Sequence, residues 1–209
     1  MAKLILVRHT KSEWNALGLW TGWSDVSLSK EGRVEAEATA KHLRDLAIDR
    51  AYTSTLKRVT ETWSIIQKTL GWNIPTTEDA ALNERNYGIY AGKNKWEIQK
   101  QVGDEEFRKI RRSWDHPIPD GETLEDVYNR VVPFYEKEIL WQAKEDKNII
   151  LLASGNSLRA LVKYLEHLTK EEVLNLEFGI GEVYVYTLDS DGKVVEKEIR
   201  AANPNKGKV

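Results

Sequence analysis

Short apolar runs along the chain predict strands that are buried on both faces. Residues 4–7 and 149–152 consist entirely of Ile, Leu and Val. A continuous apolar run of this length is typical of an interior strand of a parallel sheet, which has no polar face. Residues 50–53 predict another short strand, and the run at 149–152 extends to a strand over 148–153. We therefore expect at least three strands to share the centre of one sheet.

The stretch after residues 50–53 has apolar side chains at spacings of three and four, which indicates a helix with one face on the core. These side chains are Leu56, Val59, Trp63, Ile66 and Leu70. We expect Ser54 or Thr55 to cap this helix. Ser29 predicts the start of an earlier helix. The apolar stripe of that helix consists of Ala36, Ala40, Leu43 and Ala47.

Helix starts are clearer in the second half of the chain than in its middle. Thr123 and Thr169 each precede an acidic residue at the spacing of a capping box, and Gly155 leads into a further stretch with helical spacing. Pro133 is expected to kink or interrupt the helix that starts after Thr123. Residues 76–122 are less regular. The helical signals within them are weak and lie at 96–102 and 105–114.

The order of these elements predicts the fold class. Residues 183–188 and 194–199 have strand patterns, and Asp-Ser-Asp-Gly at 189–192 is a turn signal for an antiparallel hairpin. Strands that alternate with helices indicate a parallel sheet. We therefore predict a three-layer α/β/α fold with a mostly parallel central sheet and an antiparallel edge. A length of 209 residues fits a single domain over residues 1–209, ending in a polar tail at 203–209.

Composition narrows the class of protein. Thirty-one Lys and Arg against 33 Asp and Glu give a net charge of −2, which argues against a general nucleic-acid binder. Cysteine is absent, which removes disulfides, thiolate zinc sites and cysteine nucleophiles. No spacing of His, Asp and Glu resembles a metal-ligand set. The chain shows neither an apolar leader nor a run of about 18 apolar residues. We therefore expect a soluble, cytoplasmic protein without metal or membrane partners.

Polar side chains follow each of the predicted central strands. Arg8 and His9 follow the first, Arg58 lies shortly after the second, and residues 154–156 follow the third. Ligands of open α/β sheets bind beyond the carboxyl ends of the strands. Arginine suits bidentate contact with phosphate oxygens, and a histidine among such groups can act as base, acid or nucleophile. On the residues alone, a structural or solvated histidine is the alternative for His9.

Further charged and aromatic residues have both a functional and an ordinary interpretation. Glu84, in the polar segment 83–88, is either a general acid or base tuned by neighbouring cations or part of a loop ion pair. Arg108, Arg111 and Arg112 indicate either a solvated helix face or the site of an anionic partner. We expect solvated or capping roles for His42, His116 and His167. We expect the tryptophans after His9 to pack their loop on the protein body; they are Trp14, Trp20 and Trp23.

Several motifs, taken in order, resemble one family. Residues 6–15 read Leu-Val-Arg-His-Thr-Lys-Ser-Glu-Trp-Asn and resemble the signature of the histidine phosphatase superfamily, whose nucleophile is the histidine after the arginine. This motif alone indicates only the superfamily. Narrower motifs follow at residues 21–29, 82–88, 92–95, 111–115 and 155–161. The full set is similar to the cofactor-dependent phosphoglycerate mutases over residues 3–199.

The resemblance implies interconversion of 3-phosphoglycerate and 2-phosphoglycerate in glycolysis and gluconeogenesis. His9 would carry the phosphoryl group as phosphohistidine after priming by the cofactor 2,3-bisphosphoglycerate, and Glu84 would be acid and base for the substrate hydroxyl. The residues implied around the phosphoryl group are Arg8, Asn15, Arg58 and Asn156, and Gly155 is implied to bind the substrate. Those implied to hold the carboxylate and distal phosphate of this small three-carbon acid are Thr21, Gly22, Tyr87, Lys95, Arg111 and Arg112. Such a cationic site suits phosphoryl transfer, which depends mostly on positioning and charge stabilisation.

The chain departs from the family pattern at two strand ends. Ser154 stands where the family has a second histidine, and a hydroxyl brings a hydrogen-bond donor but no positive charge. Loss of one preorganised donor typically lowers turnover about a hundredfold to a thousandfold, so reduced activity is implied. Thr10 and Lys11 replace the usual Gly-Glu. Because a β-branched residue would be strained at positive φ, we expect an ordinary backbone at Thr10.

Two other functions remain open on the sequence. A broad phosphomonoesterase would use the same His9 and release inorganic phosphate from several monoesters without a primer. Glu84 with Arg111 and Arg112 argues against it, because a simple hydrolase needs no distal anion clamp. A non-catalytic phospho-ligand binding protein would bind phosphoglycerate without phosphorylation of His9. No feature of the sequence decides between a monomer and a dimer.

Overall fold

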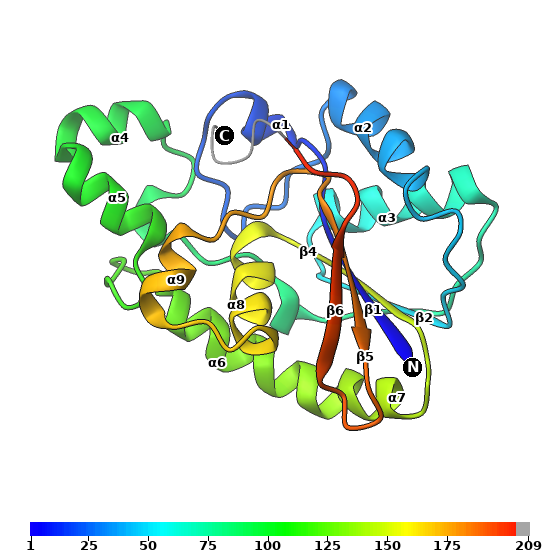
Figure 1. The fold of residues 1–209 in the computed structure, drawn as a ribbon. Helices are drawn as coiled ribbons and strands as arrows, with labels where there is room; N and C mark the ends of the chain where they lie inside the picture. Colours follow the sequence, from blue (N-terminus) through cyan, green and yellow to red (C-terminus); the bar gives the residue numbers. More distant parts are fainter. Residues whose placement is uncertain (204–209) are drawn as a thin grey trace.

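A six-stranded sheet lies at the centre of the computed structural model, which describes residues 1–203 (Figure 1). Its strands are β1 (Ala2–Arg8), β2 (Arg50–Thr53), β3 (Thr76–Glu78), β4 (Ile149–Ala153), β5 (Val183–Leu188) and β6 (Val194–Ile199). They lie in the order β3-β2-β4-β1-β5-β6. β3, β2, β4 and β1 pair in parallel, whereas β5 is antiparallel to both β1 and β6. The predicted sheet with its antiparallel edge is confirmed.

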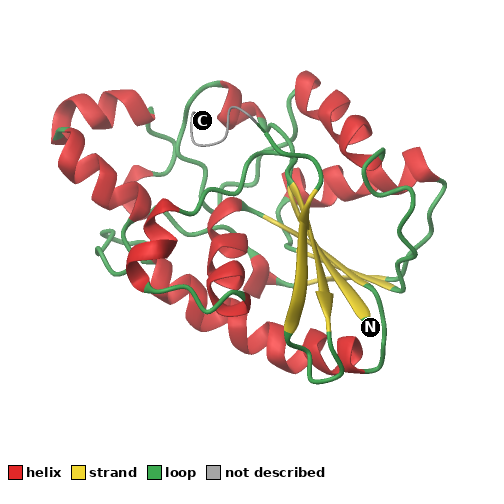
Figure 2. Cartoon of the chain, viewed as in Figure 1, coloured by secondary structure: helices red, strands yellow, loops and turns green. Residues whose placement is uncertain are grey.

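The central strands are apolar along their length because helices cover both faces of the sheet (Figure 2). In β1, Leu4 and Leu6 pack into the core on one face, and Ile5 and Val7 pack into the core on the other. Successive side chains of a strand point to opposite faces, so a strand between two helical layers needs apolar residues at every position. The predicted three-layer α/β/α class is therefore confirmed.

The later helices of the chain cover one face. They are α6 (Leu124–Phe134), α7 (Leu140–Lys144), α8 (Gly155–Leu165) and α9 (Lys170–Asn175). The capping boxes predicted at Thr123 and Thr169 are both present. A π-helical turn, Tyr135–Ile139, interrupts the α-helical pattern just after Pro133. This agrees with the predicted interruption, since proline donates no backbone hydrogen bond.

Two earlier helices, α2 (Lys30–Ala40) and α3 (Lys57–Leu70), cover the opposite face. Ser29 caps α2 as predicted. The stripe predicted to reach Ala47 is wrong at its end, because α2 stops at Ala40, Ala47 is exposed and Leu46 is buried in its place. Turns at residues 41–45 replace the last part of the expected helix.

The start of α3 also differs from the prediction. Its N-cap is Leu56, which makes no side-chain capping bond. Ser54 is buried instead, and the Thr55 hydroxyl donates to Oδ1 of Asn83 at 3.0 Å. Ser54 and Thr55 therefore tie down the strand–helix connection rather than cap the helix.

The irregular middle of the chain forms a smaller unit beside the sheet. It contains α4 (Lys95–Val102) and α5 (Asp104–Arg112), which lie at the far left of Figure 1, and the 3₁₀ turns Ala80–Leu82 and Gly88–Tyr90. α1 (Glu13–Ala16) lies in the loop after β1. A separate core holds this unit together and consists of Trp20, Ile98, Phe107, Ile110 and Ile118. Both weak helical signals correspond to helices, whereas β3 had no sequence signal because its three residues are polar.

The tail predicted at residues 203–209 lies outside the described residues beyond Asn203. Within residues 1–203, none of the helices has the length and apolar character needed to cross a bilayer.

Candidate active site

The carboxyl ends of β1, β2 and β4 meet at one edge of the sheet. Arg8 pairs with Ala153 across β1 and β4, and Thr53 pairs with Leu152 across β2 and β4. Because all three strands run in the same direction, the polar residues that follow them lie together. This is the convergence that the strand ends predicted.

One pocket at this edge gathers predicted residues from the whole length of the chain. Those that line it are Arg8, His9, Asn15, Thr21, Gly22, Arg58, Glu84, Tyr87, Lys95, Arg111, Arg112, Gly155 and Asn156. Ser154 is buried next to it, with its Oγ 3.4 Å from Nη2 of Arg58. The structure thus brings the predicted residues together, while their chemical roles remain predictions.

His9 is held in one tautomer by the backbone. Its Nδ1 lies 2.7 Å from the carbonyl oxygen of Thr10, so Nδ1 carries the proton and donates. Burial, followed by the nearby Arg58 and Arg8, lowers the pKa of His9 well below its usual value. The ring is therefore neutral and has its lone pair on Nε2. Thr10 has no positive φ, as expected, and its backbone N–H donates to the Thr62 hydroxyl at 3.2 Å.

Two guanidinium groups lie beside this imidazole, that of Arg58 buried and that of Arg8 half-buried. Nη1 of Arg8 donates to the carbonyl of Phe178 at 2.6 Å, and its buried Nε has no partner. Arg58 donates to the carbonyls of Gly22 at 2.8 Å and Ser24 at 3.1 Å. Burial lowers the pKa of Arg58 to about 10, and it also lowers the pKa of Arg8. Both guanidinium groups thus donate to neutral backbone carbonyls. A cation that is shielded from water in this way is stabilised when an anion binds beside it.

The side chain of Glu84 adds a carboxyl group to this cationic site. Its Oε1 accepts from the backbone N–H of Arg85 at 2.7 Å and from that of Asn156 at 3.2 Å. Asn156 lies in the first turn of α8, where free N–H groups favour negative charge. Two backbone donors therefore orient the carboxylate, in place of the loop ion pair considered from the sequence.

A second cationic group lines the pocket around α4 and α5. Burial, then the charges of Arg111 and Arg8, lower the pKa of Lys95 to about 7. Burial lowers the pKa of Arg112 to about 10, and Arg112 forms an ion pair with Glu177. The expected face of three arginines is wrong, because Arg108 is exposed and only Arg111 and Arg112 line the pocket.

The pocket also contains residues that the sequence analysis did not assign to it: Leu19, Trp20, Arg159, Glu177 and Phe178. Arg159 lies within a quoted motif, and its Nη1 donates to Oδ1 of Asn156 at 2.8 Å. Trp20 packs on Tyr87 with ring centroids 4.4 Å apart, so it both packs the loop and lines the site. Glu177 and Phe178 lie in an irregular segment after α9 that gave no sequence signal.

The other histidines lie outside the pocket, as expected. His42 and His167 are exposed, and Nε2 of His116 lies 2.9 Å from Oε1 of Glu106. In the described part of the chain, no three His, Asp or Glu side chains are grouped so that they could hold a metal ion. The pocket itself presents the imidazole of His9, the carboxyl groups of Glu84 and Glu177, and several cationic side chains.

Comparison with known proteins identifies the family of the chain. The model of the histidine phosphatase superfamily (branch 1) matches residues 4–199. A relative from Chelativorans sp. (strain BNC1) is 44% identical over 94% of this chain and 97% of its own length. A relative from Parvibaculum lavamentivorans is 43% identical over 94% of this chain and 95% of its own. Both are described as 2,3-bisphosphoglycerate-dependent phosphoglycerate mutases.

The fold is shared with solved structures. Bacillus stearothermophilus YhfR superposes with a TM-score of 0.81 at 25% identity and covers 93% of this chain and 94% of that one. Its agreement supports the arrangement of sheet and helices described above.

Proposed function

The chain belongs to the 2,3-bisphosphoglycerate-dependent phosphoglycerate mutases of the histidine phosphatase superfamily, and we propose on this basis that it interconverts 3-phosphoglycerate and 2-phosphoglycerate. The observation that carries the proposal is the neutral His9 ring, whose unprotonated nitrogen lies in a pocket with Arg8, Arg58 and Glu84. A nucleophile, cations and a proton donor are the groups that phosphoryl transfer requires.

In the proposed step, Nε2 of His9 attacks the phosphorus of a phosphate ester. The bond between phosphorus and the ester oxygen breaks as the Nε2–phosphorus bond forms, and the departing oxygen takes a proton from Glu84. Phosphorylated His9 passes its phosphoryl group to the free hydroxyl of 3-phosphoglycerate, whose proton goes to Glu84, so that 2,3-bisphosphoglycerate forms. Attack of Nε2 on the 3-phosphate then restores the phosphohistidine and releases 2-phosphoglycerate, as the 3-oxygen takes the proton of Glu84. Arg8 and Arg58 stabilise the negative charge that spreads over the phosphoryl oxygens.

The distal cations fit the rest of a small phosphorylated acid. Lys95, Arg111 and Arg112 line the pocket together with the hydroxyls of Thr21 and Tyr87. This second group suits the substrate's carboxylate or, for 2,3-bisphosphoglycerate, a second phosphate. Buried cations at both ends and the unpartnered Nε of Arg8 fit this cofactor, which supplies the phosphoryl group that primes His9.

We further propose that Ser154 limits the rate. Its hydroxyl lies 3.4 Å from Arg58 and carries no charge, whereas the family pattern has a histidine at this position. Replacement Ser154→His should raise the rate of phosphoglycerate interconversion about a hundredfold or more, by the usual effect of one preorganised donor. Ser154→Asn is the matched control, because it adds bulk and an amide without adding charge.

The assay follows conversion of 3-phosphoglycerate with and without 2,3-bisphosphoglycerate in the wild type and both variants. The proposal expects primer-dependent conversion that increases in Ser154→His and not in Ser154→Asn. Absence of conversion in every form contradicts the mutase function. Phosphate release from several monoesters without primer dependence would instead favour the broad phosphomonoesterase.

A glycolytic role would place the protein in the cytoplasm, and we propose this location. We also propose that the chain forms one domain, since elements from both ends of residues 1–203 join the same sheet. The proposed partner is the small three-carbon substrate.

A further inference from the structure

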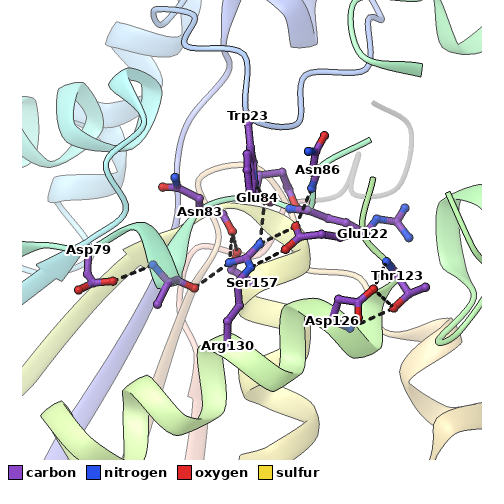
Figure 3. Close-up of polar contacts among 12 residues, drawn as sticks. Trp23, Asp79, Asn83, Glu84, Asn86, Glu122, Thr123, Asp126, Arg130 and Ser157 are labelled. Atoms are coloured by element: carbon purple, nitrogen blue, oxygen red, sulfur yellow. Dashed lines mark hydrogen bonds and ion pairs between the residues drawn. The ribbon is translucent and has the colours of Figure 1, made fainter. Parts of the chain in front are cut away.

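A largely buried ion pair outside the pocket holds the segment that carries Glu84 (Figure 3). Arg130 on α6 faces Glu122, with Nε 2.8 Å from Oε1 and Nη2 2.9 Å from Oε2. The two side chains are 20% and 17% exposed. Neither residue lines the pocket. A substrate in the pocket would therefore not touch the pair, and its arrangement needs another explanation.

The other donors of Arg130 all go to the backbone of one short segment. Nη1 donates to the carbonyls of Ala81 at 2.7 Å and Asn83 at 2.8 Å, and Nη2 donates to the carbonyl of Glu84 at 3.0 Å. Together with the two bonds to Glu122, these contacts use all the N–H donors of a guanidinium group. On the far side of Glu84, Oε2 of Glu122 accepts from the backbone N–H of Asn86 at 2.8 Å.

The segment needs such a partner because it has no regular structure. Ala81 lies in a short 3₁₀ turn and residues 83–87 belong to no helix or strand, so the carbonyl groups that Arg130 contacts have no ladder partners. A buried carbonyl without a partner is costly. Only the planar fork of an arginine can reach several carbonyls and a carboxylate at once, and a lysine ammonium cannot reproduce that geometry.

The geometry connects this backbone to the Glu84 carboxylate. The carboxylate accepts from the N–H of Arg85, so its direction depends on the backbone at residues 84 and 85. Arg130 holds that backbone before this point and Glu122 holds it after. Two further contacts act on the same carbonyls: the indole of Trp23 donates to Glu84 at 2.7 Å, and the hydroxyl of Ser157 donates to Asn83 at 2.6 Å.

We propose that Arg130, paired with Glu122, is a positioning residue that keeps the Glu84 carboxyl group at the leaving oxygen of the phosphoryl group. The inference rests on the proposed function, in which that oxygen takes the proton of Glu84 as the phosphoryl group moves to His9. A displacement of about 1 Å of a catalytic group can lower a rate about a hundredfold. Loss of the arginine fork should therefore impair proton transfer without removing the cations of the pocket.

The test compares two phosphoryl donors in single-turnover phosphorylation of His9, followed by intact mass. The alkyl oxygen of 2,3-bisphosphoglycerate needs a proton to leave, whereas p-nitrophenyl phosphate releases a stable phenolate and needs none. In Arg130→Lys, which keeps the charge opposite Glu122, we expect the rate with 2,3-bisphosphoglycerate to fall about tenfold to a hundredfold. The rate with p-nitrophenyl phosphate should stay within about threefold.

Three controls separate positioning from general damage. Glu84→Gln cannot give a proton and should show the same donor preference as Arg130→Lys. Arg200→Lys alters an arginine that bridges Asp45 and Glu198 away from the pocket, and it should change neither rate. The affinity for inorganic phosphate should be unchanged in Arg130→Lys, since Arg8 and Arg58 are intact. If Arg130→Lys does not fold, Glu122→Gln breaks the same pair and should give the same preference.

The outcomes distinguish this inference from the proposed function. Equal losses with both donors, or no loss, in Arg130→Lys overturn the positioning role. If Glu84→Gln shows no donor preference, Glu84 is not the acid and the positioning role fails with it. If the wild type is phosphorylated by neither donor, the proposed function itself is contradicted.

Discussion

The pocket brings several cationic side chains close together. Arg58 and Lys95 are buried and Arg8 is half-buried, and loss of contact with water lowers the pKa of each. Burial, and then the charges of Arg58 and Arg8, lower the pKa of His9, which favours the neutral ring. Cations shielded from water are less stable than the same side chains on a surface. Binding of an anion therefore stabilises them more than it would stabilise surface cations.

Lys95 should make substrate affinity depend on pH. Its pKa is lowered to about 7, so it is charged below that pH and neutral above it in the empty pocket. An anion binds the charged form, and binding above pH 7 therefore requires proton uptake. We expect the dissociation constant of 3-phosphoglycerate, measured by calorimetry, to rise between pH 7 and 9 by up to about tenfold per unit.

Lys95→Arg provides the control for this pH dependence. An arginine stays charged across the range, so the variant should bind with nearly constant affinity between pH 7 and 9. A wild-type affinity that is equally flat would show that Lys95 does not titrate there.

Glu177 should compete with the substrate's carboxylate for Arg112. The two side chains form an ion pair at the pocket, and both are partly exposed. Glu177→Gln removes the competing charge and should lower the KM for 3-phosphoglycerate a few-fold, with kcat little changed. Glu171→Gln, on the exposed side of α9, is the matched control and should change neither constant. A higher KM in Glu177→Gln would mean that this carboxylate helps to bind the substrate.

At the scale of elements, local signals predicted most of the fold. The apolar runs of β1 and β4 and the capping boxes before α6 and α9 are encoded within a few residues, and the structure contains all of them. Features that depend on distant contacts were missed. α2 ends at Ala40 although apolar spacing continues, and the polar strand β3 exists only because it pairs with β2.

The cap of α6 should contribute measurably to stability. The Thr123 hydroxyl accepts from the N–H of Asp126 at 3.0 Å, and the Asp126 carboxylate accepts from the N–H of Thr123 at 2.9 Å. Thr123→Ala should lower the free energy of unfolding by about 1 kcal/mol in denaturant titrations. Thr69→Ala makes the same change inside α3, where the hydroxyl only bonds back to Ile65. That control should stay within about 0.5 kcal/mol of wild type, and an equal loss in both variants would contradict the capping role.

Across the whole molecule, a chain with a net charge of −2 still brings six of its 31 Lys and Arg side chains to one pocket. The parallel order of β1, β2 and β4 brings Arg8, Arg58 and Asn156 to one edge, and the segment between β3 and α6 adds the second cationic group. The strand ends therefore predicted Arg8, His9, Arg58 and residues 154–156 from local sequence. The family motifs were needed for Asn15, Thr21, Gly22, Tyr87 and Lys95.

Long-range partners explain what the sequence did not reveal about the site. Arg130 meets the carbonyls of Ala81, Asn83 and Glu84 across 46 to 49 residues of sequence. Glu177 reaches Arg112 from a segment with no motif. Such contacts depend on how the helices pack on the sheet. The spacing of apolar and polar residues along the chain therefore cannot predict them.

Phosphorylation of His9 can be read from the intact mass of the protein after incubation with 2,3-bisphosphoglycerate, followed by peptide mapping. The account predicts one phosphoryl group per chain, located on His9 and absent from His9→Asn. A protein that gains no phosphoryl group, or gains it on another residue, would contradict the account.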